Sequence, residues 1–250
     1  MNPFSVVIPS RNADNLRACV GAIQKAGETC RIVVVDDGLP WQCFDVQRAE
    51  YCFADHVRGI KPFCFARNMN LGIKTAGMDD VILLNDDALL VSPGGFTELS
   101  QEAEAHPEYG VISAACNNVG NPNQFQKTVG SLREDPRMVC FIAVYIPRTT
   151  IERVGLLDEE LTGYGYDDDL YCARLRAAGL KIGIYDGCFV DHSKLKPTFR
   201  GLPNVNDLMA YNRAVYARKG GAGDPRLNLK TRTVLHETTS GIIGVLRFFF

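Results

Sequence analysis

Residues 81–87 read Val81-Ile82-Leu83-Leu84-Asn85-Asp86-Asp87, an unbroken apolar run that ends in one amide and two carboxylates. The same pattern occurs earlier, where Ile32-Val33-Val34-Val35 is followed by Asp36-Asp37-Gly38. Apolar runs without polar alternation are typical of strands buried on both faces, as in a parallel sheet covered by helices. Ligands of such sheets bind beyond the carboxyl ends of the strands. We therefore expect both acidic pairs to open onto one crevice.

The rest of the chain alternates between short apolar runs and segments of helical periodicity. We expect strands at residues 4–8, 31–35, 81–84, 110–114, 139–146, 181–185 and 189–190. We expect helices at about residues 12–26, 65–76, 93–105, 148–154 and 167–178, the first of them capped by Asn12 or Asp14. Residues 117–137 are predicted to form a flexible loop. The pattern predicts an α/β fold with a mostly parallel, Rossmann-like central sheet covered by helices on both faces.

The composition is that of a globular chain with a substantial core. Of 250 residues, 46% are hydrophobic and 22% are charged, which excludes disordered and collagen-like proteins. The 27 Lys and Arg nearly balance the 29 Asp and Glu, which argues against a dedicated nucleic-acid coat. This balance conceals an uneven distribution, because residues 193–250 hold ten basic and three acidic residues. The sequence therefore predicts an acidic body followed by a basic tail.

Three features of the sequence predict a cytoplasmic location. The nine cysteines are scattered without a C-x-x-C pair, as expected of reduced, buried thiols. The N-terminal residues lack the basic and apolar segments of a signal peptide. No apolar run approaches the roughly 20 residues that a membrane span needs. The apolar end of the chain, residues 242–250, leaves open a peripheral contact with the inner face of a membrane.

The two acidic pairs favour a metal site. Adjacent carboxylates repel each other unless a cation or hydrogen-bond donors offset their charge. Either pair alone is explained equally well as a turn, but two pairs at equivalent strand ends favour a divalent cation. Mg²⁺ and Mn²⁺ take carboxylate oxygens together with substrate phosphates, which indicates a nucleotide-diphosphate ligand. The sequence has neither a P-loop nor a G-x-G-x-x-G motif, so ATPase and dinucleotide-binding functions lose their main support.

A third acidic cluster, Asp167-Asp168-Asp169, opens the helix expected at residues 167–178. Carboxylates commonly complement the positive end of a helix dipole at its N-terminus. Three adjacent carboxylates exceed what this role requires, because each added negative charge raises the electrostatic repulsion among them. A carboxylate beside a hydroxyl group can also act as a general base.

Five motifs in sequence order, spanning residues 6–192, resemble glycosyltransferase family 2, whose members have the GT-A fold. The motifs are Val6-Val7-Ile8-Pro9-Ser10-Arg11-Asn12, Val33-Val34-Val35-Asp36-Asp37-Gly38, Ala66-Arg67-Asn68-Met69-Asn70-Leu71-Gly72-Ile73, Leu83-Leu84-Asn85-Asp86-Asp87, and Gly155-Leu156-Leu157-Asp158-Glu159 leading into Tyr164–Gly179. The resemblance implies a metal-dependent, inverting transfer of a sugar from a UDP-, GDP- or dTDP-linked donor to a hydroxyl group.

The resemblance also implies roles for single residues. Asp167 matches the family's general base, and Asp168 is an additional carboxylate that competes for this role. Asp87 and His192 match ligands of Mn²⁺ or Mg²⁺, and Asp37 matches the residue that binds the nucleobase. The full set implied for binding the nucleotide sugar is Pro9, Ser10, Asn12, Asp36, Asp37, Arg67, Asn85 and Asp86.

Two positions depart from the family pattern. Asn85 stands at the first position of the Asp-x-Asp motif, and Tyr166 replaces the Glu that precedes the base. Three alternatives to an inverting transferase therefore stay open: a nucleotidyltransferase, a retaining transferase of the same fold, and a nucleotide-sugar-binding protein without turnover. The glycine-poor segment after the first strand disfavours the nucleotidyltransferase.

We expect residues 1–192 to form the GT-A domain, with a nucleotide-sugar half at about 1–115 and an acceptor half at about 116–192. Residues 193–250 are expected to form a basic lid loop and a helical or irregular tail, with a helix at 206–219. Lys194, Lys196 and Arg200 are candidates for closing over the diphosphate. The tail packs on its own domain, mediates a homo-oligomer, or meets an anionic surface, and the acceptor is a glycan, a lipid-linked glycan or, less favoured, a nucleic acid.

Overall fold

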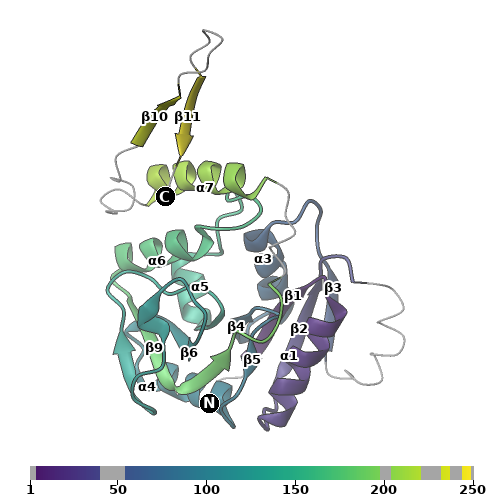
Figure 1. Ribbon diagram of the computed structural model, residues 1–250. Coiled ribbons are helices and arrows are strands. Elements are labelled where there is room, and N and C mark those ends of the chain that lie inside the picture. Colours follow the sequence, from purple (N-terminus) through teal and green to yellow (C-terminus); the bar gives the residue numbers. More distant parts are fainter. Residues whose placement is uncertain (1–3, 40–53, 198–203, 221–231, 237–243, 249–250) are drawn as a thin grey trace.

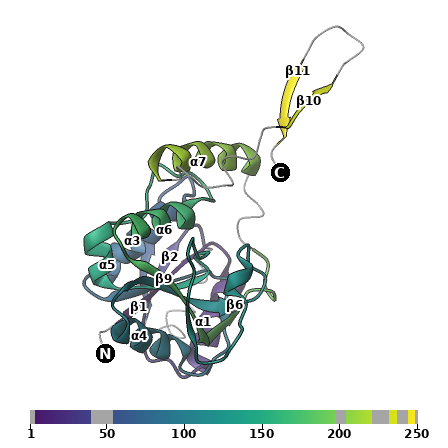
Figure 2. The same cartoon turned by 90° about the vertical axis from the view of Figure 1, so that its left-hand side faces the viewer.

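The computed structural model describes residues 4–39, 54–197, 204–220, 232–236 and 244–248. A central sheet carries helices on both faces, and two C-terminal elements lie beyond it (Figures 1 and 2). The sheet strands are β1 (Phe4–Ser10), β2 (Arg31–Asp36), β3 (Ala54–Arg58), β4 (Asp80–Leu84), β5 (Leu89–Leu90), β6 (Tyr109–Cys116), β7 (Leu132–Glu134), β8 (Ala143–Ile146) and β9 (Lys181–Asp191). The helices are α1 (Ala13–Lys25), α3 (Phe65–Ala76), α4 (Gly95–Ala105), the short 3₁₀ turn η1 (Pro122–Gln124), α5 (Arg148–Val154), α6 (Asp167–Ala177) and α7 (Val205–Lys219).

The nine-stranded sheet has the order β3-β2-β1-β4-β8-β6-β9-β5, with β7 paired to β9. The strands β3, β2, β1 and β4 run parallel, as the buried apolar runs predict. The other half is mixed, because β8 runs antiparallel to both β4 and β6 while β6 and β9 are parallel. The prediction of a mostly parallel sheet is therefore correct for the N-terminal half alone. In that half the carboxyl ends of β1, β2 and β4 meet at one edge.

Two hydrophobic clusters show why both faces of the sheet are covered. Residues of one strand alternate between the faces, so that Val6 and Ile8 of β1 lie in the cluster with α1 and α4, whereas Val7 lies in the cluster with α3, α5 and α6. All three side chains are fully buried. This arrangement confirms the predicted three-layer α/β fold.

Local sequence explains how α1 and α3 are placed on the sheet. The side-chain oxygen of Asn12 accepts hydrogen bonds from the backbone N–H groups of Asp14 and Asn15, which begins α1 at the predicted cap. Gly72, in the middle of α3, lets this helix lie directly on β1. A Cβ atom at this glycine would be 2.1 Å from Cγ1 of Val7, so a larger residue would prevent this close packing. A glycine in the middle of a helix costs about 1 kcal/mol of stability relative to alanine.

Residues 117–137 differ from the prediction of a flexible loop. They contain η1 and β7, and buried polar side chains rather than apolar ones hold them in place. Gln124 donates to Ser113 Oγ at 2.9 Å and accepts from the Cys140 N–H at 2.7 Å. Arg133 forms a two-pronged ion pair with the buried carboxylate of Asp186. Polar contacts of this kind leave no trace in hydrophobic periodicity. For this reason the sequence pattern does not predict that residues 117–137 are ordered.

The C-terminal part begins with α7, which starts and ends within one residue of the predicted helix. Val215 and Tyr216 of α7 pack on Leu161, Leu170 and Ala173, so the helix lies against α6 and the segment before it. Beyond α7, β10 (Arg232–His236) and β11 (Gly244–Phe248) pair as an antiparallel hairpin, a structure that the expectation of a helical or irregular tail did not include (Figure 2). Among the described residues, no helix is both long and apolar enough to cross a bilayer.

Candidate active site

The ends of β1 and β4 form the centre of the candidate site. The parallel register pairs Val7 with Leu83, and three residues further along the hydroxyl of Ser10 donates to Oδ2 of Asp86 at 2.6 Å. A hollow opens at this point of the sheet edge. It is lined by Pro9, Phe63, Phe65, Asn85, Asp86, Asp87 and Tyr164. The structure therefore brings together four of the residues predicted from sequence: Pro9, Asn85, Asp86 and Asp87.

His192 lies beside Asp87 because of the antiparallel pairing of β5 with β9. Leu89, two residues after Asp87, pairs with Asp191, and Nε2 of His192 lies 3.1 Å from Oδ1 of Asp87. The other ring nitrogen lies 3.1 Å from the Asn118 carbonyl oxygen, which fixes the ring orientation. Burial lowers the pKa of His192, but the hydrogen bond and charge of Asp87 outweigh it, and the net shift of the pKa is upward. The predicted pair of metal ligands is thus in direct contact.

These two side chains fit a cation that completes its shell from a substrate. Among the described residues, no three or more His, Cys, Asp or Glu side chains cluster to enclose a metal. Asp87 and His192 supply one carboxylate and one imidazole at a single point beside the hollow. Hard divalent cations that act on nucleotides keep several positions for phosphate oxygens and water. One carboxylate and one imidazole therefore fit a divalent cation, and its binding here stays a prediction.

Asp36 and Asp37 have different surroundings despite being neighbours. Asp36 closes the turn after β2, since its Oδ1 accepts from the backbone N–H groups of Gly38 and Leu39 at 2.8 and 2.7 Å. Asp37 is 2% exposed, and its Oδ1 is contacted by Nζ of Lys61 at 3.1 Å and receives a hydrogen bond from Asn68 at 3.2 Å. Its Oδ2 is buried and has no hydrogen-bond partner within the described part of the chain. One carboxylate oxygen of Asp37 is thus buried and unpaired among the described residues.

Two other predicted nucleotide-binding residues are engaged with the backbone. Asn12 caps α1, as described above. The guanidinium of Arg67 donates to the carbonyl oxygens of Ile60, at 3.2 Å, and Pro62. These bonds hold the segment that carries Lys61 beside Asp37. In this structure Arg67 supports the pocket wall, and a direct contact of Asn12 or Arg67 with a nucleotide stays a prediction.

The third acidic cluster lies at the N-terminus of α6. Asp167 is 5% exposed, and its Oδ2 accepts from the Gly165 N–H at 3.0 Å. Burial, and next the charge of Asp168, raise the pKa of Asp167 well above the usual carboxylate range. Burial and the charge of Asp169 raise the pKa of Asp168 to about 7. Carboxylates with raised pKa values suit proton transfer near neutral pH.

Tyr164 connects the acidic cluster with the hollow. It lines the hollow beside Asp87, and its pKa is raised first by burial and then by the charges of Asp168, Asp167 and Asp87 among others. Tyr164 therefore lies within electrostatic range of both the predicted base and the predicted metal ligand. Phe63, Phe65 and Tyr164 were missed by the sequence analysis. The sequence signal for them was their position, because Phe63 and Phe65 lie close to Arg67 in the chain and Tyr164 lies close to Asp167.

The predicted lid is described only in part. Nζ of Lys194 lies 2.9 Å from Oδ2 of Asp191, and the backbone carbonyl of Lys196 accepts from the Asn15 side chain at 3.0 Å. Arg200 lies outside the described residues. Closure of this segment over a diphosphate stays a prediction.

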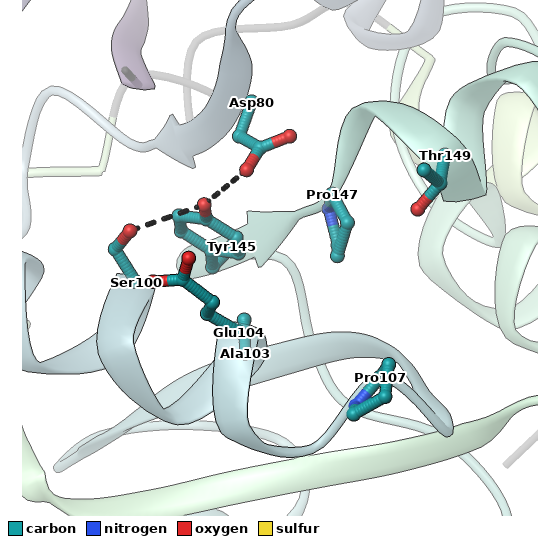
Figure 3. A pocket seen from close by; sticks show the side chains of 8 residues that line it. All are labelled: Asp80, Ser100, Ala103, Glu104, Pro107, Tyr145, Pro147 and Thr149. Carbon is teal, nitrogen blue, oxygen red and sulfur yellow. Dashed lines mark hydrogen bonds between the residues drawn. The ribbon is translucent and has the colours of Figure 1, made fainter. Parts of the chain in front are cut away.

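A second hollow lies at the opposite end of β4 and contains none of the predicted site residues (Figure 3). Its lining residues are Asp80, Ser100, Ala103, Glu104, Pro107, Tyr145, Pro147 and Thr149. The Tyr145 hydroxyl donates to Oδ2 of Asp80 at 2.5 Å and lies 3.2 Å from Ser100 Oγ. These polar groups satisfy one another, and we interpret this hollow as structural.

Sequence comparisons place the chain in a known family. Residues 5–138 match the family model described as glycosyl transferase family 2. No curated protein sequence matches the chain significantly.

Solved structures share the fold at low sequence identity. The crystal structure of GalNAc-T7 with UDP, GalNAc and Mn²⁺ superposes with a TM-score of 0.64 and 14% identity, covering 77% of this chain and 44% of that one. S. aureus TarS superposes with a TM-score of 0.63 and 15% identity, covering 87% of this chain and 40% of TarS. Its fragment 1–349 gives a TM-score of 0.58 and 13% identity, with 91% and 75% covered. The chain thus spans less than half of the length of the first two.

Proposed function

Because the chain belongs to glycosyl transferase family 2, we propose that it transfers a sugar from a nucleotide-diphosphate sugar to an acceptor hydroxyl group with inversion at the anomeric carbon. The observation that carries this proposal is the meeting of the Ser10–Asp86 pair and the Asp87–His192 pair at one hollow, which Tyr164 also lines. Asp167 follows Tyr164 by three residues in the chain and has a raised pKa. These groups would supply a donor-binding edge, a cation site and a base.

The nucleotide would bind along the ends of β1 and β2. Uracil, thymine and guanine each present a ring N–H beside a carbonyl oxygen. Oδ2 of Asp37, which is buried without a partner among the described residues, is suited to accept such an N–H, and Lys61 beside it is suited to donate to the carbonyl. This pairing supports UDP, GDP or dTDP donors and does not choose between them.

Asp87 and His192 would hold Mn²⁺ or Mg²⁺. GalNAc-T7, which shares this fold, was crystallised with Mn²⁺ and UDP, and this supports a divalent cation here. When bound, the cation offsets the negative charge that develops on the departing diphosphate. Asp86, whose Oδ2 accepts from the Ser10 hydroxyl, lines the same hollow and would contact the ribose or the cation.

Asp167 would act as the general base. Its second carboxylate oxygen would take the proton of the acceptor hydroxyl, whose oxygen forms a bond to the anomeric carbon while the bond from that carbon to the diphosphate breaks. The Gly165 N–H donates to the first oxygen, Oδ2, and helps to orient the carboxylate. The rings of Phe63, Phe65 and Tyr164 limit the access of water to the hollow.

A screen of nucleotide sugars for metal-dependent thermal stabilisation, followed by transfer assays, tests this function. A true donor should stabilise the fold by about 2.7 kcal/mol at one hundred times its dissociation constant. Chelation should abolish both the stabilisation and turnover, and NMR of the product should show an inverted anomer. A retained anomer would identify a retaining transferase, and pyrophosphate release from a nucleoside triphosphate would identify a nucleotidyltransferase.

One observation favours a second candidate, a nucleotide-sugar-binding protein without turnover. Tyr166 stands where the family has a Glu, and its ring packs on Tyr216 with a centroid distance of 5.5 Å. The position is thus used for packing α7 and not for chemistry. Tight, metal-dependent donor binding without transfer or hydrolysis would identify this candidate.

A further inference from the structure

The side chain of Asn212, in the middle of α7, is bonded to the loop that precedes the proposed base. It is fully buried, and its amide N–H₂ group donates to the carbonyl oxygens of Thr162, Tyr164 and Gly165 at 2.8, 3.2 and 2.9 Å. Its Oδ1 accepts from the Thr162 N–H at 2.9 Å. One side chain therefore contacts four backbone groups on three residues of this loop, with its two amide hydrogens shared among three carbonyl oxygens.

The loop has glycines at the two places where α7 presses against it. A Cβ atom at Gly163 would lie 2.7 Å from Cδ1 of Leu208, and one at Gly165 would lie 2.2 Å from Sδ of Met209. Both glycines also have positive φ angles, of 63° and 102°, which disfavour other residues. The loop conformation and the docking of α7 are thus matched to each other.

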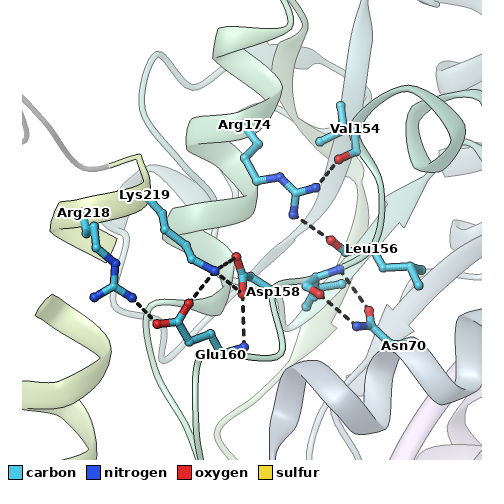
Figure 4. A network of polar contacts seen from close by, with 9 residues as sticks. Asn70, Val154, Leu156, Asp158, Glu160, Arg174, Arg218 and Lys219 are labelled. Atoms are coloured by element: carbon cyan, nitrogen blue, oxygen red, sulfur yellow. Dashed lines mark hydrogen bonds and ion pairs between the residues drawn. The ribbon is translucent and has the colours of Figure 1, made fainter. Parts of the chain in front are cut away.

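Ion pairs fasten the C-terminal end of α7 to the same part of the domain (Figure 4). Nζ of Lys219 lies 2.7 Å from both Oδ2 of Asp158 and Oε2 of Glu160, and Arg218 also pairs with Glu160. Such exposed pairs contribute little stability each. They join the C-terminal end of α7 to residues 158 and 160, which immediately precede the loop that Asn212 contacts.

We propose that Asn212 is a positioning residue for the base Asp167, acting through the loop of residues 162–165. The link is short: Asn212 holds the carbonyl of Gly165, and the N–H of Gly165 donates to Oδ2 of Asp167 at 3.0 Å. Asn212 also holds the backbone of Tyr164, which lines the hollow. The inference rests on the proposed function, and it makes α7, in the basic C-terminal part, a component of the active site.

The nearly isosteric substitution Asn212→Asp tests this role, because it replaces the amide donor by an oxygen that repels three carbonyl groups. We expect kcat to fall about 10- to 100-fold, as is typical when a reacting group is misplaced by an ångström, while KM for the donor stays within about twofold. Among the described residues, the hydrogen bonds of the Asn212 side chain go to the loop of residues 162–165 and not to the ends of β1, β2 and β4. Equal losses in both parameters, or an unchanged kcat, would overturn the proposal.

Asn70→Asp is the matched control. Asn70 is buried, donates to the Leu157 carbonyl and to Glu159, and accepts from the Leu157 N–H, each at 2.9 Å. It thus holds a neighbouring loop in the same way without reaching Asp167. We expect a comparable loss of stability with kcat within about twofold of wild type. If both variants lose kcat in proportion to stability, Asn212 is only structural.

Hydrogen exchange provides a readout that needs no activity. In Asn212→Asp, exchange of a peptide covering residues 162–169 should accelerate selectively, whereas Asn70→Asp should leave it unchanged. Asn212→Ser, which replaces the amide by a hydroxyl that can still donate one hydrogen bond, should give intermediate exchange and serves if the Asp variant does not fold. Unchanged exchange would overturn the inference even in an active enzyme. Accelerated exchange in a protein that transfers no sugar would instead reject the proposed function and retain the structural link.

Discussion

The Ser10 hydroxyl and Oδ2 of Asp86 form a 2.6 Å hydrogen bond between residues that are 76 positions apart in the chain. The bond joins the ends of two adjacent parallel strands at the edge where the donor is proposed to bind. Hydrogen bonds from a hydroxyl to a buried carboxylate are short and strong. This bond therefore fixes Asp86 before any ligand arrives.

Replacing Ser10 by Ala should leave a buried carboxylate oxygen without this donor. We expect the free energy of unfolding to fall by about 1–3 kcal/mol and donor affinity to fall about tenfold. Ser5→Ala is the control, because Ser5 donates to Asp79 at 2.6 Å from the opposite end of β1. Denaturant unfolding and donor titration of both variants separate a stability effect from a binding effect. Equal losses of affinity would contradict a role at the site.

Asp167→Asn should remove the base and leave donor binding nearly intact. The expected loss in kcat is about 10²- to 10⁴-fold, the usual contribution of general base catalysis. The amide still accepts from the Gly165 N–H, so the loop geometry is kept. Steady-state kinetics with donor-dependent thermal shift check both parts. Retention of more than about a tenth of wild-type kcat would exclude Asp167 as the base.

Asp168→Asn should move the pH profile of kcat towards lower pH. The charge of Asp168 is, after burial, the largest cause of the raised pKa of Asp167, so its removal lowers that pKa. A base acts when deprotonated, and turnover falls as the pH drops through its pKa. The acidic limb should therefore shift downward while maximal kcat is kept. Abolished turnover would instead identify Asp168 as the base.

The same variant should be more stable than the wild type above about pH 4. A carboxyl group whose folded pKa is raised binds more protons in the native state than in the unfolded state. The native state is therefore penalised as the pH rises from the unfolded pKa of about 3.9 towards the folded value of about 7. Each unit of this shift corresponds to about 1.4 kcal/mol at most. Denaturant unfolding at pH 4 and pH 8 should show the gain at pH 8 alone.

Asp87→Asn and His192→Ala should weaken the cation site. The two side chains are in contact, so loss of either should raise the Mn²⁺ concentration for half-maximal stabilisation in the presence of UDP by about tenfold or more. His106→Ala serves as a surface control, because this histidine pairs with Glu102 and Glu108 far from the hollow. Thermal shift across a metal titration gives the comparison. A metal response unchanged in the first two variants would remove them as ligands.

Local patterns predicted much of the fold and part of the site. The bounds of α3 and α5 and the Asn12 cap agree with expectation, because periodicity and capping chemistry act within a few residues. The two-residue strand β5 was missed, because so short a run carries no periodic signal. It is nevertheless the pairing of β5 with β9 that brings His192 to Asp87.

The remainder of the site depends on contacts between distant parts of the chain. Asn212 bonds to backbone groups about fifty positions away. Every residue has such backbone groups, so the sequence does not indicate which of them a side chain will contact. The sequence signal for this contact is the pair Gly163 and Gly165, because glycine allows another segment to pack closely. Tyr164 could not be predicted as a site residue for another reason. An aromatic residue in a sequence is equally consistent with a place in the core and with a place in a binding site.

The contact between Asp87 and His192 closes a span of 105 positions, and the Asn212 contacts add a segment still later in the chain. Contacts of such sequence separation are entropically expensive and tend to form late in folding. During synthesis, all four strands of the parallel half have been made long before His192 and Asn212. The donor-binding strands are thus made first, and the site is complete only once β9 and α7 have docked.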